Sequence, residues 1–130
     1  HQIEGYRWME TRVLHDGQGC VLADQMGLGK SLQVLALVHE HLHQSPTHTA
    51  LIIVPATLIM NWVEEAIKFL PPGAGGIDLT AVSSEDPIRE RREKILRWHQ
   101  KGGGGLIISY ESFRAIVHAG STVMDKDGNE

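Results

Sequence analysis

Short apolar runs alternate with longer amphipathic segments along this chain, and this alternation constrains its fold more than any other feature. Residues 20–23 (CVLA), 50–55 (ALIIVP) and 106–109 (LIIS) are apolar at nearly every position, and 77–82 (IDLTAV) is a weaker candidate strand. Strands that are apolar on both faces and separated by helices are typical of a parallel sheet with helices on both faces. We therefore predict an α/β fold with about four strands.

The segments between these runs have the periodicity of helices. Helical spacing of apolar residues is found in four segments: 31–43, 57–70, 86–101 and 110–120. Thr57 and Asp86 are residue types that cap helix N-termini, so we expect them to begin their helices. Trp8 and Trp62 are expected to pack in the core. The last ten residues are polar and predict a loop.

Composition sets outer limits on function. A chain of 130 residues is long enough for one domain with a core. The formal net charge of −4 argues against a surface basic enough to coat nucleic acid non-specifically. The single cysteine, Cys20, fits a reducing compartment. The sequence shows neither a membrane span nor a signal peptide, and because it starts with His1 we expect it to be cut from a longer protein.

Residues 23–31 (ADQMGLGKS) come close to the phosphate-binding pattern G-x-x-x-x-G-K-[ST], with Asp24 in place of the first glycine. A glycine loop that leads into a helix offers N–H donors and positive potential to a phosphate. We expect Lys30 to reach the β- and γ-phosphates and Ser31 to bind Mg²⁺, so the predicted cofactors are ATP and Mg²⁺. The predicted cradle consists of Gly27, Leu28, Gly29, Lys30 and Ser31.

The wider segment GCVLADQMGLGKSLQVLAL resembles motif I of the Swi/Snf-type DNA translocases, a branch of helicase superfamily two. In that family the loop has the sequence D-E-M-G-L-G-K-T, with aspartate where other phosphate loops have glycine. Gln25 and Ser31 depart from the pattern, although Ser31 keeps the hydroxyl. The resemblance implies a RecA-like P-loop NTPase lobe.

Three further segments resemble motifs of the same family. HQIEGYRWM (1–9) is similar to its adenine-recognition segment, which implies that Gln2 hydrogen-bonds adenine. LIIVPATLIMNWVEEAIKFLP resembles motif Ia and includes the family's N-W-x-x-E, and LIISYESFRA resembles motif Ib. For motif Ia, a plain strand-to-helix turn is an equal alternative. The DNA-contacting residues implied are Pro55, Ala56, Thr57, Ser109 and Tyr110.

The resemblance implies that residues 1–130 are the N-terminal, incomplete part of the first RecA-like lobe of an ATP-dependent double-stranded-DNA translocase. Such a translocase serves chromatin remodelling or recombination and repair, so the implied partners are DNA, nucleosomes or recombination proteins, and the rest of the helicase domain. It would be nuclear in a eukaryote and otherwise cytoplasmic. The family's aspartate-glutamate box and second lobe are not found here, so we expect the parent protein to be the enzyme and this chain alone not to hydrolyse ATP. A non-catalytic nucleotide- or partner-binding scaffold and a small-molecule phosphotransferase stay open as alternatives.

Two other patterns have competing interpretations. HEHLH (39–43) matches the zinc pattern H-E-x-x-H, with Glu64 or Glu65 as conceivable third ligands, but we favour a solvated helix end. RERREKILR (89–97) is basic enough for DNA contact, but we favour a solvated face with i,i+4 charge pairs.

Overall fold

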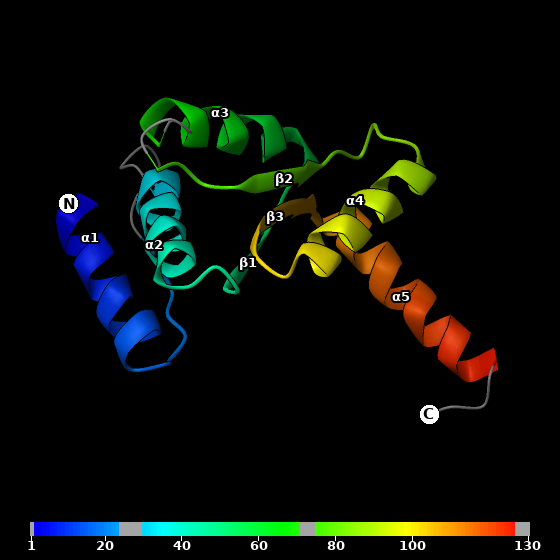
Figure 1. Ribbon diagram of the computed structural model, residues 1–130, viewed down its shortest axis with the longest axis horizontal. Coiled ribbons are helices and arrows are strands. Elements are labelled where there is room, and N and C mark those ends of the chain that lie inside the picture. Colours follow the sequence, from blue (N-terminus) through cyan, green and yellow to red (C-terminus); the bar gives the residue numbers. More distant parts are fainter. Residues whose placement is uncertain (1, 24–29, 71–74, 127–130) are drawn as a thin grey trace.

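The computed structural model describes residues 2–23, 30–70 and 75–126, and side-chain burial for 4–23, 30–70 and 75–118 (Figure 1). The strands are β1 (Thr49–Val54), β2 (Leu79–Val82) and β3 (Gly104–Ser109). The helices are α1 (Gln2–Met9), α2 (Lys30–Gln44), α3 (Ile59–Phe69), α4 (Ile88–Lys101) and α5 (Tyr110–Lys126), with a π-helical turn η1 (Glu10–His15) and a 3₁₀ turn η2 (Ala56–Leu58). The predicted α/β class is confirmed.

The three strands form one parallel sheet in the order β1-β3-β2, with β3 in the centre. Val54 of β1 pairs in register with Ser109, and Val82 of β2 pairs with Ile108. All three strands are joined by helical connections, as parallel strands require. Consequently β1 and β3 end together at one edge of the sheet.

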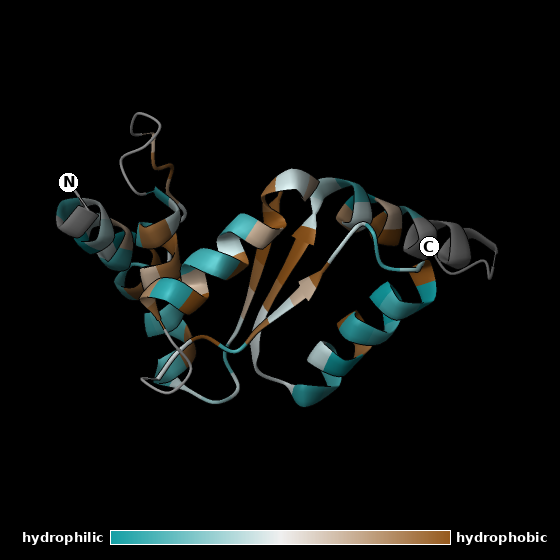
Figure 2. Cartoon of the chain, turned by 90° about the horizontal axis from the view of Figure 1, so that it is seen from above, coloured by the Kyte–Doolittle hydropathy of each residue, from teal (hydrophilic) through white to brown (hydrophobic). Residues whose placement is uncertain are grey.

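Apolar side chains on both faces of the sheet pack against helices, and Figure 2 shows hydrophobic strands between helices whose outer faces are hydrophilic. On one face the core is Ile52, Val54, Ile59 and Ile107, covered by Val38 of α2 and by Trp62 and Val63 of α3. On the other face it is Val82, Leu106 and Ile108, covered by Ile95 and Trp98 of α4 and by Phe113 of α5. The predicted sheet with helices on both faces is therefore confirmed, and so is the packing of Trp62. Helix α1 packs mainly against α2 and η1.

The connection between α4 and β3 depends on glycine. Gly102 ends α4 in the left-handed region at φ 72°, which glycine adopts without the steric cost that a side chain brings. Its N–H donates to the carbonyl of Trp98, and the Trp98 indole N–H donates to the carbonyl of Gly104 at 2.9 Å. This turn therefore fixes where β3 begins relative to α4.

Two of the predicted element boundaries were wrong. Residues 20–23, predicted as a strand, have irregular backbone, and Val21 is 80% exposed. No described strand pairs with them, and an apolar run becomes a strand only when a neighbour accepts its hydrogen bonds. The predicted C-terminal loop is helical as far as Lys126, because a single Gly120 costs only about 1 kcal/mol in a helix and does not end it.

The predicted caps and one predicted core residue were also wrong. Thr57 lies within η2 and makes no capping bond to α3, and Asp86 precedes Pro87, the residue that caps α4. Pro87 is the cap because its carbonyl accepts the first helical hydrogen bond, from the N–H of Arg91. Trp8 is 42% exposed, whereas the neighbouring Met9 is 3% exposed and takes the buried position on α1.

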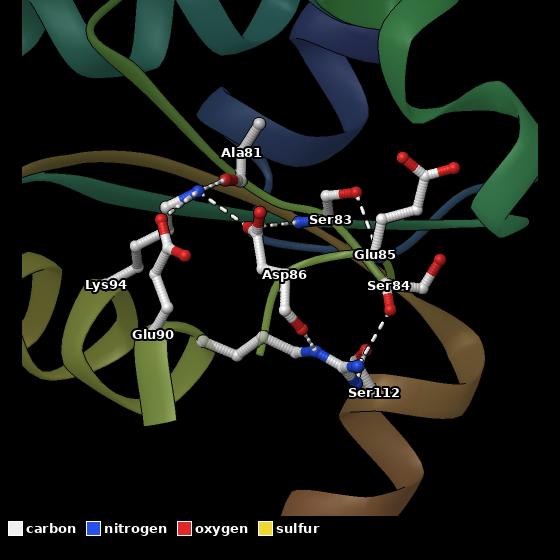
Figure 3. A network of polar contacts seen from close by, with 9 residues as sticks. Ala81, Ser83, Ser84, Glu85, Asp86, Glu90, Lys94 and Ser112 are labelled. Carbon is white, nitrogen blue, oxygen red and sulfur yellow. Dashed lines mark hydrogen bonds and ion pairs between the residues drawn. The ribbon is translucent and has the colours of Figure 1, made fainter. Parts of the chain in front are cut away.

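Asp86 instead organises the turn between β2 and α4 (Figure 3). Its carboxylate accepts hydrogen bonds from the Nζ of Lys94 at 2.7 Å and from the N–H of Ser83 at 3.2 Å. Arg91 donates to the Asp86 carbonyl at 2.7 Å and to the Ser112 hydroxyl of α5 at 3.4 Å. The hydrogen bond from Lys94, followed by that from Ser83, lowers the pKa of Asp86. This network joins the end of β2 to α4 and α5.

We expect Asp86→Asn to lower stability at pH 7 because it removes the charge that Lys94 pairs with. The pKa of this carboxyl is lower in the folded state than its ordinary value of 3.8. Its contribution to stability is therefore fully present above that pH and is lost progressively as pH falls from there through the lower folded-state pKa. In urea unfolding, the difference in free energy of unfolding between wild type and Asp86→Asn should therefore be smaller at pH 3 than at pH 7. Glu85→Gln, at an exposed neighbouring position, should have the same free energy of unfolding as wild type at both pH values. If the stability loss caused by Asp86→Asn is equal at pH 7 and pH 3, this assignment is contradicted.

Candidate functional site

The phosphate-loop candidate leads into helix α2, which begins at Lys30. Lys30 and Ser31 occupy its first turn, and both residues are half-buried. N–H groups in the first turn of a helix have no acceptor within the helix, so they are available to an anion. The other loop positions singled out in the sequence lie outside the described residues: Asp24, Gln25, Gly27, Leu28 and Gly29.

Ser31 contacts the neighbouring helix through its side chain. Its hydroxyl donates a hydrogen bond to the carboxylate Oε2 of Glu65, which lies 34 residues further along the chain in α3. Both residues are half-buried. Helix α3 covers the same face of the sheet as α2, so this bond connects the start of α2 to that layer.

The hydroxyl oxygen of Ser31, the residue after Lys30, suits a magnesium ion. Mg²⁺ prefers hard oxygen ligands and is usually held by one or two protein oxygens together with water and substrate phosphates. A serine hydroxyl that gives its hydrogen to a carboxylate keeps its oxygen lone pairs for another ligand. The residues present therefore fit the ion that the sequence pattern predicts.

Helix α1 lies against α2 at Gly5, where a larger residue would force the buried side chain of Gln33 to shift. A Cβ atom built on Gly5 would lie 1.9 Å from Oε1 and 2.9 Å from Cδ of Gln33, a residue of α2 that is 2% exposed. The two helices begin at the same end (Figure 1), so Gln2, the first residue of α1, starts near the first turn of α2. The side chain of Gln2 is outside the described residues. Gly5 is therefore a point of close approach between α1 and α2.

The turns after β1 and β3 leave the same edge of the sheet, because Val54 and Ser109 pair in register. After β1, Pro55 and Thr57 are exposed and Ala56 is half-buried. After β3, Ser109 is 0% exposed, and its hydroxyl accepts the N–H of Ser112 at 3.1 Å and so caps α5. Tyr110 follows it and is 55% exposed. The structure thus brings the five DNA-contact candidates to one edge, with Ser109 in a supporting, buried position.

The histidines of the HEHLH segment interact with each other and with backbone carbonyls. His39 Nε2 lies 2.6 Å from the carbonyl of Gly75, and His43 Nδ1 lies 2.8 Å from the carbonyl of His39. The two rings stack at 4.0 Å between centroids. Among the described residues there is no group of three or more histidines, cysteines or acids that could hold a metal ion. Glu65, a conceivable third zinc ligand, accepts a hydrogen bond from Ser31.

The charged helix α4 carries the predicted mixed pairs. Arg89 pairs with Glu93 at 3.4 Å and Lys94 approaches Glu90 at 3.9 Å, both at i,i+4 spacing. The prediction of i,i+4 charge pairs along this helix is therefore confirmed.

Sequence reasoning did not connect Glu65 with Ser31, and it assigned no role to Gly5. A signal for Glu65 was present in the N-W-x-x-E pattern. Residues at i and i+3 share one helix face, so a glutamate three positions after the core-packed Trp62 points inward rather than into solvent. Gly5 had a comparable signal, because it lies in the HQIEGYRWM segment that resembles the family's adenine-recognition motif. Its contact is with the side chain of Gln33, 28 positions away in sequence.

Residues 1–122 match the family described as the SNF2-related domain. The chain belongs to the SNF2-related family. The predicted membership of the Swi/Snf-type branch of helicase superfamily two is therefore confirmed.

Several curated proteins of recombination and repair are similar to this SNF2-related chain. A DNA repair and recombination protein RAD54-like from Mus musculus is 36% identical over 132 residues, which cover 90% of this chain and 17% of that protein. The protein of the same name from Drosophila willistoni is 38% identical, and the match covers 91% of this chain and 16% of that protein. DNA repair protein rhp54 from Schizosaccharomyces pombe is 34% identical, and the match covers 90% of this chain and 15% of that protein. The chain thus spans about a sixth of the length of these relatives.

Within the described ranges of this SNF2-related chain, none of the helices has both the length and the apolar character that crossing a membrane requires.

We expect Gly5→Ala to lower the free energy of unfolding by about 1–3 kcal/mol, because the new methyl group overpacks the buried side chain of Gln33. This opposes the gain of about 1 kcal/mol that alanine brings to a helix. Urea unfolding measures the difference, and the double variant Gly5→Ala/Gln33→Ala should lose less than the two single changes added together.

The matched control is Gly19→Ala, because a Cβ on Gly19 meets nothing within 4 Å. It should be neutral or slightly stabilising. If Gly5→Ala proves more stable than wild type, helix propensity outweighs the contact and our account of how α1 and α2 approach is wrong.

Proposed function

We propose that this chain is the nucleotide-binding part of an ATP-dependent motor that translocates along double-stranded DNA. Membership of the SNF2-related family supports the motor class, and the names of the repair and recombination relatives support DNA as the track. The observation that carries the proposal is that Lys30 and Ser31, the last two residues of a phosphate-binding sequence pattern, lie in the first turn of α2.

In this proposal Lys30 pairs with the β- and γ-phosphates of ATP, and the N–H groups from Gly27 to Ser31 cradle the β-phosphate. The positive end of the α2 dipole adds to the same attraction. Ser31 is a ligand of Mg²⁺, which when bound neutralises phosphate charge and orients the β- and γ-oxygens. The half-buried setting of Lys30 and Ser31 strengthens these interactions relative to open water.

Gln2 reads the adenine base through its amide, which offers a donor and an acceptor side by side. The close contact of Gly5 with Gln33 supports this role, because it brings the start of α1 to the start of α2. A base-reading residue and a phosphate-binding lysine must lie at one end of the molecule to hold one nucleotide.

The DNA track includes the turns after β1 and β3. Exposed Pro55 and Thr57, the backbone at Ala56 and the exposed ring of Tyr110 face one edge, and Ser109 holds the second turn by capping α5. Backbone N–H groups and hydroxyls at helix starts suit contact with DNA phosphates, which positions a protein without reading sequence.

The biological setting that we propose follows the same reasoning. The relatives' names point to recombination and repair, so recombination proteins and nucleosomes are the proposed partners. A motor that acts on chromosomal DNA works in the nucleus of a eukaryote or in the cytoplasm of a prokaryote.

The direct test is Lys30→Ala in the natural full-length protein. Hydrogen bonds to charged groups contribute about 1.5–3 kcal/mol, so affinity for Mg-ATP should fall roughly 10- to 100-fold. DNA-stimulated phosphate release should be lost with it. Both are measured by nucleotide titration and by a phosphate-release assay with and without double-stranded DNA.

Lys101→Ala is the control, because Lys101 ends α4 on the opposite face of the sheet and forms an exposed ion pair with Asp78. Exposed pairs contribute about 0–1 kcal/mol, so this change should leave nucleotide affinity intact. Nucleotide affinity that does not respond to Lys30→Ala would contradict the proposed site. Turnover that is insensitive to DNA would exclude the motor and favour a phosphotransferase, and binding without turnover would favour a scaffold.

A further inference from the structure

The bond between Ser31 and Glu65 lies at the start of α2 and is formed by two elements far apart in the sequence. Ser31 is the second residue of α2, and Glu65 lies near the middle of α3. The hydroxyl is the donor and the carboxylate Oε2 is the acceptor, in a half-buried setting. Partial burial of a hydroxyl and a carboxylate costs free energy, and the hydrogen bond between them offsets part of that cost.

The hydroxyl of Ser31 has one hydrogen and two lone pairs. When its hydrogen is given to Glu65, the rotation of the hydroxyl is fixed and its lone pairs remain for another ligand. A carboxylate that accepts from a metal-ligating group orients that ligand and raises its basicity, as partners in the outer shell of metal sites generally do.

Glu65 forms no ion pair within the part of the chain that the structure describes. A half-buried carboxylate without a cationic partner attracts a cation and repels the phosphates of a nucleotide that arrives without one. Its charge therefore discriminates between metal-bound and metal-free nucleotide.

We propose that Glu65 is a positioning residue that orients the Ser31 hydroxyl toward Mg²⁺ and makes the site select Mg-nucleotide over free nucleotide. This inference rests on the proposed function, because it requires Ser31 to be the metal ligand. Glu65 acts through Ser31 and its own charge, and it does not contact the reacting phosphate.

A purely structural role makes a different prediction. If the bond only ties α2 to α3, its loss weakens the site equally for nucleotide with and without metal. If Glu65 selects the metal-bound form, its loss weakens Mg-nucleotide binding and leaves metal-free binding unchanged or tighter, because a repelling charge has been removed.

The experiment measures the affinity of the natural full-length protein for a non-hydrolysable ATP analogue, once with excess Mg²⁺ and once with a chelator. Glu65→Gln should reduce the affinity gain due to Mg²⁺ by about 10-fold, the lower end of what loss of an outer-shell partner costs. Ser31→Ala should reduce the same gain, and the double variant should lose less than the product of the two single effects. The control is Glu64→Gln, which removes a charge from the neighbouring exposed position of α3 and should keep the wild-type gain.

The outcomes separate this inference from the proposed function. The role of Glu65 is overturned if Glu65→Gln loses the same affinity with and without Mg²⁺, or if its affinity gain due to Mg²⁺ is unchanged or larger than in wild type. In either case Lys30→Ala still tests the nucleotide site independently. If wild type binds the analogue in neither condition, or if Lys30→Ala binds as wild type does, the proposed function fails and this inference fails with it. Should Glu65→Gln not fold, Glu65→Asp replaces it, because the side chain shortened by one methylene group cannot hold Ser31 in the same position and should also reduce the gain.

Discussion

Pairing of β3 on both of its edges is the constraint on which the rest of the structure depends. Residues Gly105–Ser109 are buried throughout, with β1 on one side and β2 on the other. Because side chains alternate across a strand, Ile107 joins one core and Leu106 and Ile108 join the other. A shift of one residue would exchange these faces, so the register of β3 is fixed by burial. The same register brings the turns after β1 and β3 to one edge.

The sequence predicted the strands around 50–55 and 106–109 because complete burial leaves a direct trace, a run of apolar residues without alternation. The strand prediction failed at residues 20–23. An apolar run there shows only that apolar residues are present and not that a neighbouring strand pairs with them. Helix starts were placed less well, since Asp86 has the chemistry of a cap but uses it for Ser83 and Lys94. Competition between local and tertiary partners for one carboxylate cannot be read from the order of residues.

The candidate site was predictable where it follows a local pattern and hidden where it depends on contacts between helices. Lys30 and Ser31 end a glycine-rich phosphate-binding pattern and begin helix α2, and a short window of sequence contains all of that pattern. Glu65 acquires its position from the way α3 lies beside α2, and Gly5 from the buried side chain of Gln33. The proposed nucleotide site therefore involves three helices, α1, α2 and α3, of which only α2 carries a recognisable phosphate pattern.

Hydrogen exchange at the start of α2 tests the central claim most directly. The N–H groups of Lys30, Ser31 and Leu32 lie in the first turn, where a helix provides no acceptor, so they should exchange quickly in the free full-length protein. If these groups hold the phosphates of ATP, a Mg-bound non-hydrolysable analogue should slow their exchange while leaving the first turn of α4 unchanged. Exchange at 30–32 that is unaffected by saturating analogue, or protection that appears only elsewhere, would contradict the account.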